Sequence, residues 1–214
     1  GEFFAYASDA AGNFDIWVAK ADGSDPEQLT HDPSLDWGPD WSPDGSRLAF
    51  VSERDGGRDI YTIELSERRV ERITRTPGLW KGWVRLAWSP AGRRLAFDAH
   101  PVVAFGDWDI YTVNADGTGQ RRIIDMPLHA TMPRWSRDGA SLLFSSSGPA
   151  GGSAIYRGDA DGEARDNLTQ DADLDDDPEP LTAPDAFAFR SDRDSAPGHI
   201  DIHVLRTDSG ERVN

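Results

Sequence analysis

Short runs of apolar residues, bounded by Gly, Pro and Asp, recur along the whole chain. Five of them share one pattern: FFAYAS at 3–8, LAFVS at 48–52, LAFDA at 95–99, LLFSS at 142–146 and FAFRS at 187–191. Runs of this length that are rich in Phe, Val and Leu indicate short antiparallel strands separated by turns. No segment keeps a sustained 3.6-residue period, so the sequence predicts an all-β fold with helix content near zero.

A turn motif recurs at nearly constant spacing between these runs. Residues 41–45 read WSPDG, residues 88–92 read WSPAG and residues 135–139 read WSRDG, 47 residues apart each time. A degenerate fourth copy, LTAPD, occupies residues 181–185, 46 residues further on. A second marker, D-I-Y or a variant of it, begins at residues 15, 59, 109, 154 and 201. Together the two series predict five units, approximately 1–34, 35–80, 81–127, 128–174 and 175–214.

Each unit has the composition of one small antiparallel sheet. Asp-Gly at 22–23, 116–117 and 161–162 suits tight hairpin turns, because Gly adopts a positive φ at little cost. One such sheet cannot bury both of its faces, whereas sheets stacked around an axis can, which is the arrangement of a β-propeller. We therefore predict a single domain of five blades, mostly of four antiparallel strands. The first unit begins at its second strand, so the first blade is expected to lack its innermost strand.

The combined series W-S-P-D-G, L-A-F-x-S-x-R-D-G, D-I-Y and L-T resembles the repeat of TolB-like β-propellers over essentially the whole chain. In that family the innermost strand of each blade ends at the W-S-P-D-G motif. The resemblance implies innermost strands at 35–41, 83–88 and 130–135, with a degenerate one at 177–182. TolB propellers have six blades and an additional N-terminal domain. The five D-I-Y markers favour a five-bladed ring over a part of a larger one.

Charge and composition narrow the choice of partners. A net charge of −16 and a pI near 4.5 disfavour nucleic acid and anionic membranes, whose phosphates would be repelled. The absence of cysteine excludes disulfides and thiol chemistry. No apolar run approaches the roughly 20 residues of a membrane helix, and no signal peptide is recognisable. By resemblance, the chain is expected to act as a monomer in the periplasm or outside the cell.

The repeated positions are interpreted as scaffold. Periodic S-P-D-G and D-G segments are typical of turns rather than of metal or phosphate loops. The Asp of each D-I-Y triplet is expected to cap a local turn through its own backbone. Trp41, Trp88 and Trp135 are expected to fill the wedge between blades. Function must then lie in the residues that differ between units.

The segments just before the innermost strands differ most, and a propeller brings them to one end of its central channel. Exposed tryptophans beside charged and imidazole groups would suit a sugar ring or a peptide segment there; alternatively, Trp37 and Trp83 close the channel mouth as plugs. An apolar insertion at 100–108 is a further candidate contact loop, unless it folds back on its own blade. The predicted ligand-binding residues are Asp36, Trp37, Trp80, Lys81, Trp83, His129, Arg134 and Asp177.

Six carboxylates fall within residues 171–179, a density at which a hard cation such as calcium could be bound. An EF-type loop requires Gly at its sixth position and Glu at its twelfth, but Asp176 and Thr182 occupy those places. A solvated acidic loop is therefore the favoured interpretation, and no cofactor is expected.

Recognisable catalytic motifs are absent. There is no G-x-S-x-G nucleophile elbow and no H-E-x-x-H metal motif. The favoured function is a non-enzymatic module that binds a protein or peptide through its channel-mouth loops. The alternatives are a carbohydrate-active propeller, either a glycan-binding module or a manganese-dependent polysaccharide lyase, and the accessory propeller of a larger peptidase. In the lyase, His129, His31 and His100 would be candidate metal ligands and Lys81 or an Arg the candidate base.

Overall fold

Each repeat forms one antiparallel sheet, and the part of the chain that the structure describes consists of strands, turns and loops. The computed structural model describes residues 2–75, 80–81, 84–101, 107–148, 151–162, 165–170, 174–183, 185–193 and 199–213, without the side chains of residues 80, 81 and 101. No helix occurs in these ranges. The all-β prediction is therefore confirmed.

The strands group into five sheets in chain order, which we number 1 to 5. Sheet 1 contains β1 (Phe3–Ser8), β2 (Asp15–Lys20) and β3 (Glu27–Gln28). Sheet 2 contains β4 (Asp36–Trp41), β5 (Arg47–Ser52), β6 (Asp59–Glu64) and β7 (Arg69–Arg72). Sheet 3 contains β8 (Trp80–Lys81), β9 (Leu86–Trp88), β10 (Arg94–Pro101), β11 (Asp109–Asn114) and β12 (Arg121–Ile124).

The last two sheets repeat the four-stranded pattern of sheet 2. Sheet 4 contains β13 (Ala130–Trp135), β14 (Ser141–Ser147), β15 (Ser153–Asp159) and β16 (Arg165–Asn167). Sheet 5 contains β17 (Asp176–Pro180), β18 (Ala186–Ser191), β19 (Asp201–Arg206) and β20 (Arg212–Val213).

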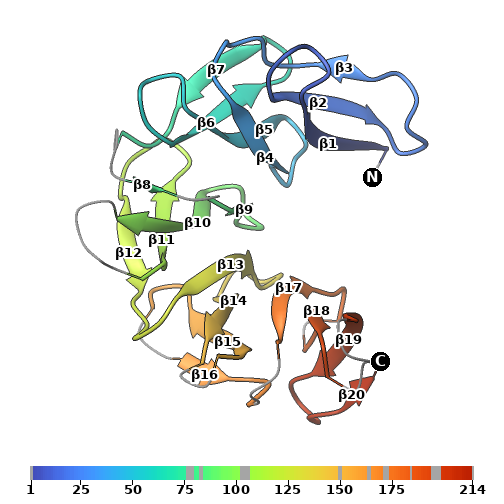
Figure 1. The fold of residues 1–214 in the computed structure, drawn as a ribbon, viewed down its shortest axis with the longest axis vertical. Helices are drawn as coiled ribbons and strands as arrows, with labels where there is room; N and C mark the ends of the chain where they lie inside the picture. The colour runs from blue at the N-terminus through green and yellow to red at the C-terminus, as the bar shows by residue number, and fades with distance from the viewer. Residues whose placement is uncertain are drawn as a thin grey trace.

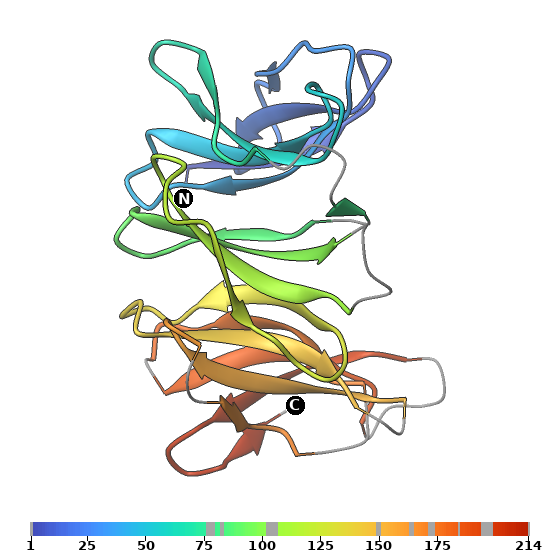
Figure 2. The same ribbon diagram turned by 90° about the vertical axis from the view of Figure 1, so that its left-hand side faces the viewer.

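The sheets follow one another around an arc with β1, β4, β9, β13 and β17 toward its concave side (Figure 1). Turned on its side, the molecule shows sheets that lie as successive layers (Figure 2). Substantial contacts between sheets link β1 to β4, β4 to β9, β10 to β13 and β14 to β17, but they join no described strand of sheet 1 to one of sheet 5. The fold is a β-propeller of five blades, and the first blade has three strands, as predicted.

The W-S-P-D-G segments are turns that their own side chains hold closed. In sheet 2, the Ser42 hydroxyl donates to Asp44 Oδ1 at 2.7 Å, and the Gly45 N–H donates to the Ser42 carbonyl at 2.9 Å. Gly45 has φ of +70°, a left-handed conformation that glycine adopts without a Cβ clash. The hydrogen bonds to Asp44 lower its pKa to about 2. The motif therefore serves the turn, as expected.

The Asp of the D-I-Y triplet has a different partner from the one expected. The Thr74 hydroxyl donates to Asp59 Oδ1 at 2.7 Å and accepts the Ile60 N–H at 2.9 Å. Thr30 makes the same pair of bonds to Asp15 and Ile16 in sheet 1. The predicted cap of a local turn is therefore wrong in these two sheets: the Asp ties the strand that it begins to the Thr that follows the next strand, because both groups are buried there.

Tryptophans of the turn motif fill the seams between sheets. Trp88 and Trp135 are buried in core clusters that span neighbouring sheets, and the Trp135 indole N–H donates to the Ala87 carbonyl at 3.2 Å. The guanidinium of Arg47 lies 4.8 Å from the Trp88 ring centroid, and that of Arg94 lies 4.7 Å from Trp135. Each Arg belongs to the preceding sheet, so each seam closes on a cation–π contact. The wedge prediction is confirmed at these two positions.

Candidate binding surface of the central channel

The predicted binding residues lie at two levels of the channel. The inner strands run from the Asp36 end, where Asp36 pairs with Ser52, to the Trp41 end, where the turn motif begins. Six residues of strand separate these ends by roughly 17–20 Å. Arg134 precedes Trp135 and lies at the turn-motif end, whereas His129 lies just before β13 at the other end. The structure therefore does not bring Arg134 together with Asp36, Trp37 or His129.

The backbone of β8 places Trp80 and Lys81 at the Asp36 end. Lys81 pairs with His100 and Trp80 with Pro101, at the end of β10 far from Arg94. Trp83 lies outside the described residues. We call the Asp36 end of the channel the upper mouth, and it includes Asp36, Trp37, Trp80, Lys81 and His129.

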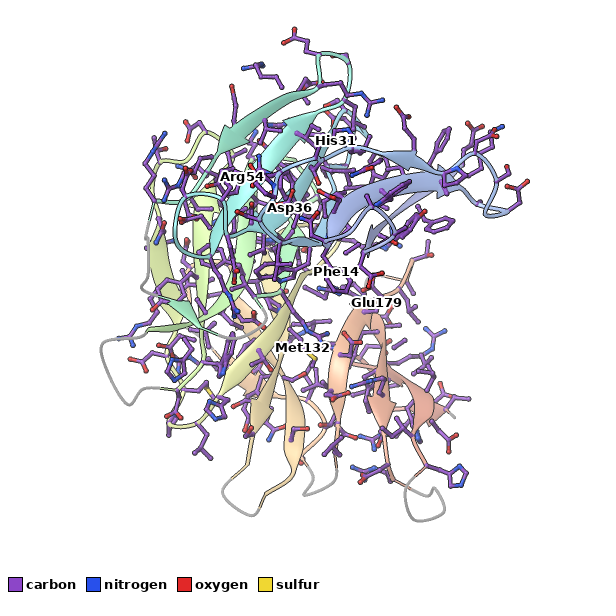
Figure 3. All side chains as sticks on the ribbon, turned by 45° about the horizontal axis from the view of Figure 1, so that its top comes forward. Phe14, His31, Asp36, Arg54, Met132 and Glu179 are labelled. Carbon is purple, nitrogen blue, oxygen red and sulfur yellow. The ribbon has the colours of Figure 1, made fainter. Side chains whose placement is uncertain are left out.

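Two of the upper-mouth residues are covered by protein. Trp37 is only 6% exposed, and it packs with Val51 and Val84 while the Arg58 guanidinium lies 5.3 Å from its ring. Asp36 is buried and accepts a hydrogen bond from Arg54 at 2.8 Å; Figure 3 labels both residues, Asp36 at the start of β4 and Arg54 in the turn after β5. This placement matches the plug alternative for Trp37, since the indole contributes to the core.

His129 remains on the surface. Its side chain is 47% exposed, and its Nδ1 accepts the Trp108 N–H at 3.1 Å and lies 3.5 Å from Asp107 Oδ1. A neutral imidazole that accepts at Nδ1 carries its proton on Nε2. His129 can therefore present a donor at the rim.

The middle of the channel wall is held by a buried carboxylate. Asp98 of β10 accepts the Arg85 N–H at 2.6 Å and the Met132 N–H at 2.9 Å, which ties the inner strands of sheets 3 and 4 together. Burial raises the pKa of Asp98 to about 6, although both hydrogen bonds lower it. Met132 has φ of +57°, an uncommon conformation for a residue with a side chain. Asp177, with φ of +53°, occupies the same place in sheet 5 and donates its N–H to the Ser145 hydroxyl at 3.2 Å.

Charged side chains of alternating sign line the channel from its middle to its turn-motif end, a stretch that we call the lower channel. Arg134 Nε donates to Glu179 Oε2 at 3.0 Å, and Arg85 lies 3.7 Å from Asp177. Met132 and Glu179 come from neighbouring inner strands on the concave side of the arc (Figure 3). Asp40 accepts the Trp88 N–H at 2.8 Å, and burial raises its pKa. A cavity of about 360 Å³ opens here, and its lining includes Asp40, Trp88, Arg134, Trp135, Arg137 and Glu179.

Sequence reasoning missed Asp40, Arg85 and Glu179. Asp40 and Arg134 lie one position before the motif Trp and Arg85 lies three before it, and the strand register puts Glu179 and Asp177 one and three positions before Pro180, which takes the place of that Trp in sheet 5. Alternate strand residues share one face of a sheet. That period would have pointed to the channel wall.

Comparisons with known proteins support the TolB-like repeat that the sequence indicates. The TolB beta propeller domain family matches residues 1–82. The Tol-Pal system protein TolB of Desulfosudis oleivorans is 33% identical over 124 residues, which cover 56% of this chain and 26% of that protein. The repeats belong to the TolB-like propeller family.

Solved structures extend the TolB-like fold over the whole chain. TolB from Acinetobacter baumannii superposes with a TM-score of 0.80 at 22% identity, and covers 99% of this chain and 53% of that one. Oligogalacturonate lyase from Vibrio parahaemolyticus superposes with a TM-score of 0.74 at 16% identity, and covers 100% and 61%. At such identities the likeness shows the fold alone. The chain spans about a quarter to a half of the length of the curated relatives it matches, from 26% to 51% in the first three.

The acidic stretch at residues 171–179 lies outside the shared positions of the TolB-like repeat, and the structure describes it only in part. Asp176 receives two hydrogen bonds of 2.8 Å from Arg190, and buried Asp175 lies 3.6 Å from Arg193. Residues 171–173 and 102–106 lie outside the described residues, so the calcium site and the insertion loop stay predictions. Within the described ranges, no three His or acidic residues are grouped to hold a metal ion. Those ranges also contain no helix long and apolar enough to cross a membrane.

Proposed function

We propose that this chain is a non-enzymatic TolB-like propeller module that binds a protein or peptide through the loops at its upper mouth. The observation that carries the proposal is that shared and variable positions of the repeat have different structural roles. Among shared residues, Asp59 and Thr74 join strands within a sheet and Trp88 packs between sheets, whereas residues that differ between units gather along the channel. Binding function belongs to the positions that the scaffold leaves variable.

The partner is expected in the bacterial envelope, in the periplasm or at the cell exterior. Matched relatives bear the name Tol-Pal system protein TolB, which associates them with a multi-protein system. A net charge of −16 would steer a basic partner toward the propeller and repel acidic ones. The chain would act as a monomer that contributes one binding surface.

Capture from an envelope extract, run beside a glycan array, tests this proposal. His129→Ala alters the upper mouth, Trp83→Ala removes a side chain that the sequence predicts there, and Arg134→Ala alters the lower channel. Arg157→Ala is a matched control in the same sheet as His129, because Arg157 pairs with Asp166 on the outer strands. A protein captured by the wild type and by Arg157→Ala, but lost with His129→Ala or Trp83→Ala, is the expected result. Capture that none of the channel variants weakens would contradict it.

The alternatives give different outcomes in the same experiment. A glycan retained on the array and lost with Trp83→Ala would favour a carbohydrate-binding module. Manganese binding that His129→Ala abolishes would favour a lyase, since imidazole nitrogens suit this class of metal. Co-purification with a peptidase domain would favour the accessory propeller.

A further inference from the structure

Three seams share one backbone hydrogen bond at the upper mouth. In each of them, an N–H at the start of an inner strand donates to a carbonyl of the preceding sheet. These bonds join Asp36 to Phe14 at 2.8 Å, Ala130 to Trp108 at 2.7 Å and Asp175 to Ser153 at 3.1 Å. The residue before each donor is Leu35, His129 or Leu174. Of these three, only His129 has a side chain that can gain a charge.

His129 adds a second hydrogen bond to the one shared by the seams. Its Nδ1 accepts the Trp108 N–H at 3.1 Å, and its own carbonyl accepts the Ser147 N–H at 3.1 Å. The N–H of Trp108 is therefore held by the imidazole, and the C=O of Trp108 by Ala130. Because the imidazole is about half exposed, protons from solvent can reach it.

Asp107 supplies an alternative partner for the same nitrogen. Its Oδ1 lies 3.5 Å from His129 Nδ1, and within the described ranges no group donates a hydrogen bond to this carboxylate. A neutral imidazole accepts at one nitrogen, whereas an imidazolium donates from both and accepts at neither. A proton taken from solvent onto Nδ1 therefore ends the bond from Trp108 and permits a charge-assisted bond to Asp107.

The other carboxylates around this joint already have partners. Asp109 and Asp125 pair with Arg122 at 3.0 and 2.9 Å. Asp98 lies deeper in the channel wall, where it accepts two backbone N–H groups. Asp107 is thus the carboxylate that a protonated His129 can engage without breaking another ion pair.

A second imidazole contacts Trp108 from β10. The His100 and Trp108 rings meet edge to face with their centroids 6.0 Å apart. His100 Nδ1 is buried and has no hydrogen-bond partner in the described part of the chain. The backbone of His100 pairs with Lys81, whose side chain lies outside the described residues. His100 therefore reports on the indole, but it offers no pair of competing hydrogen bonds.

We propose that His129 is a proton-operated switch of the upper mouth. In its neutral form the imidazole anchors the Trp108 backbone. When Nδ1 is protonated, the imidazole turns to Asp107, Trp108 loses its anchor, and the mouth takes a second arrangement. Histidine protonation can change an interface in this way. The effect on partner binding rests on the proposed function, whereas the switch itself does not.

Heteronuclear NMR of the full chain with labelled histidine tests the switch without a partner. From about pH 8 to about pH 5, His129 should pass from the Nε2–H tautomer to the form protonated on both nitrogens. The Trp108 amide resonance should shift over the same range. His129→Ala should abolish this shift, and His31→Ala, a matched control at an exposed position before β4, should retain it.

Two further variants separate the contributions of the neighbours. Asp107→Asn should move the response of the Trp108 amide to lower pH by a few tenths of a unit, the size expected for a half-exposed ion pair. His100→Phe keeps an aromatic edge on Trp108 and should leave the response in place.

Three outcomes would overturn the proposal. The first is an amide shift that survives His129→Ala but not His100→Phe, because His100 would then be the sensor. The second is a neutral His129 that carries its proton on Nδ1. The third is protonation of His129 that leaves the Trp108 amide unmoved. If the resonances behave as expected but capture from the envelope extract is equal at both pH values, binding through the upper mouth is contradicted and the switch is not.

Discussion

Sheets 1 and 3 come from the same repeat, but within the described residues sheet 3 packs against a sheet on each side and sheet 1 against a sheet on one side only. In sheet 3, Gly117 packs on the Ile73 carbonyl of sheet 2, and Arg94 covers Trp135 of sheet 4. In sheet 1, a Cβ on Gly23 would meet no described atom within 4 Å, and Phe3 stands at the position of Arg94. The hairpins are alike, so the difference lies in the seams. Stability in such stacked units comes largely from the interfaces between neighbours.

The largest expected effect comes from the seam tryptophans. Trp135→Ala removes a buried indole between sheets 3 and 4 and should lower the free energy of unfolding by about 3–5 kcal/mol. Trp41→Ala in the seam between sheets 1 and 2 should cost about 1–2 kcal/mol, since its ring is only partly buried and borders an open cavity of about 570 Å³. Urea denaturation of both variants measures this; equal losses would show that the first seam is as well packed as the third.

Two matched turn glycines isolate the effect of a close neighbour. Gly23 and Gly117 have the same φ of +82°, and each follows an Asp that accepts the N–H of the residue after the glycine at 2.9 Å. Gly23→Ala should cost about 1–2 kcal/mol for the left-handed conformation. Gly117→Ala adds a Cβ 2.8 Å from the Ile73 carbonyl oxygen, so its loss should be larger by about 1–3 kcal/mol. Thermal unfolding of the pair tests the difference, and similar melting temperatures would contradict it.

The seam between sheets 3 and 4 should also respond to pH through Asp98. Burial raises its folded pKa to about 6, above the ordinary value of 3.8, so the folded state binds the proton more tightly. The stability contributed is full below the unfolded pKa and is lost as pH rises through about 6. Between pH 5 and pH 7 the free energy of unfolding should fall by about 1 kcal/mol from this group. Sheet 1 has Ala7 at the same register and gains no such dependence.

Urea titrations of the wild type and of Asp98→Asn at pH 5, 6 and 7 isolate this contribution from the other carboxylates. The difference in stability between the two proteins should change with pH. A constant difference would mean that Asp98 stays ionised throughout this range.

The smallest effect tests whether sheet 1 can be made to resemble sheet 3. Phe3→Arg places a guanidinium where Arg47 and Arg94 cover the next tryptophan, here Trp41. A gain of about 0.5–1 kcal/mol is expected from the cation–π contact. Chemical denaturation with Phe3→Met as the control separates this contact from the removal of an exposed ring; no advantage of Arg over Met would refute it.

Much of the fold could be predicted from the repeat alone. Turn residues such as Gly45 and Gly117, with φ of +70° and +82°, were predicted because few other residues tolerate that backbone. The candidate site could be predicted less well from the sequence. His129 lies just before β13 and Arg134 lies five positions later within it, but the sequence did not show that they lie at different levels of the channel. Trp37 was expected on the rim, and packing against Val84 of the next sheet buries it.

Periodicity by itself determined the number of blades, the antiparallel strands, the turns and the three-stranded first sheet, because these depend on local backbone preference and on alternation within a few residues. The tertiary structure alone decided that Asp59 bonds Thr74, that Asp98 bridges two inner strands, and that the first seam stays open beside Phe3. Each of these depends on side chains that different repeats bring to a shared boundary, and their burial is set by the neighbour rather than by the repeat that carries them.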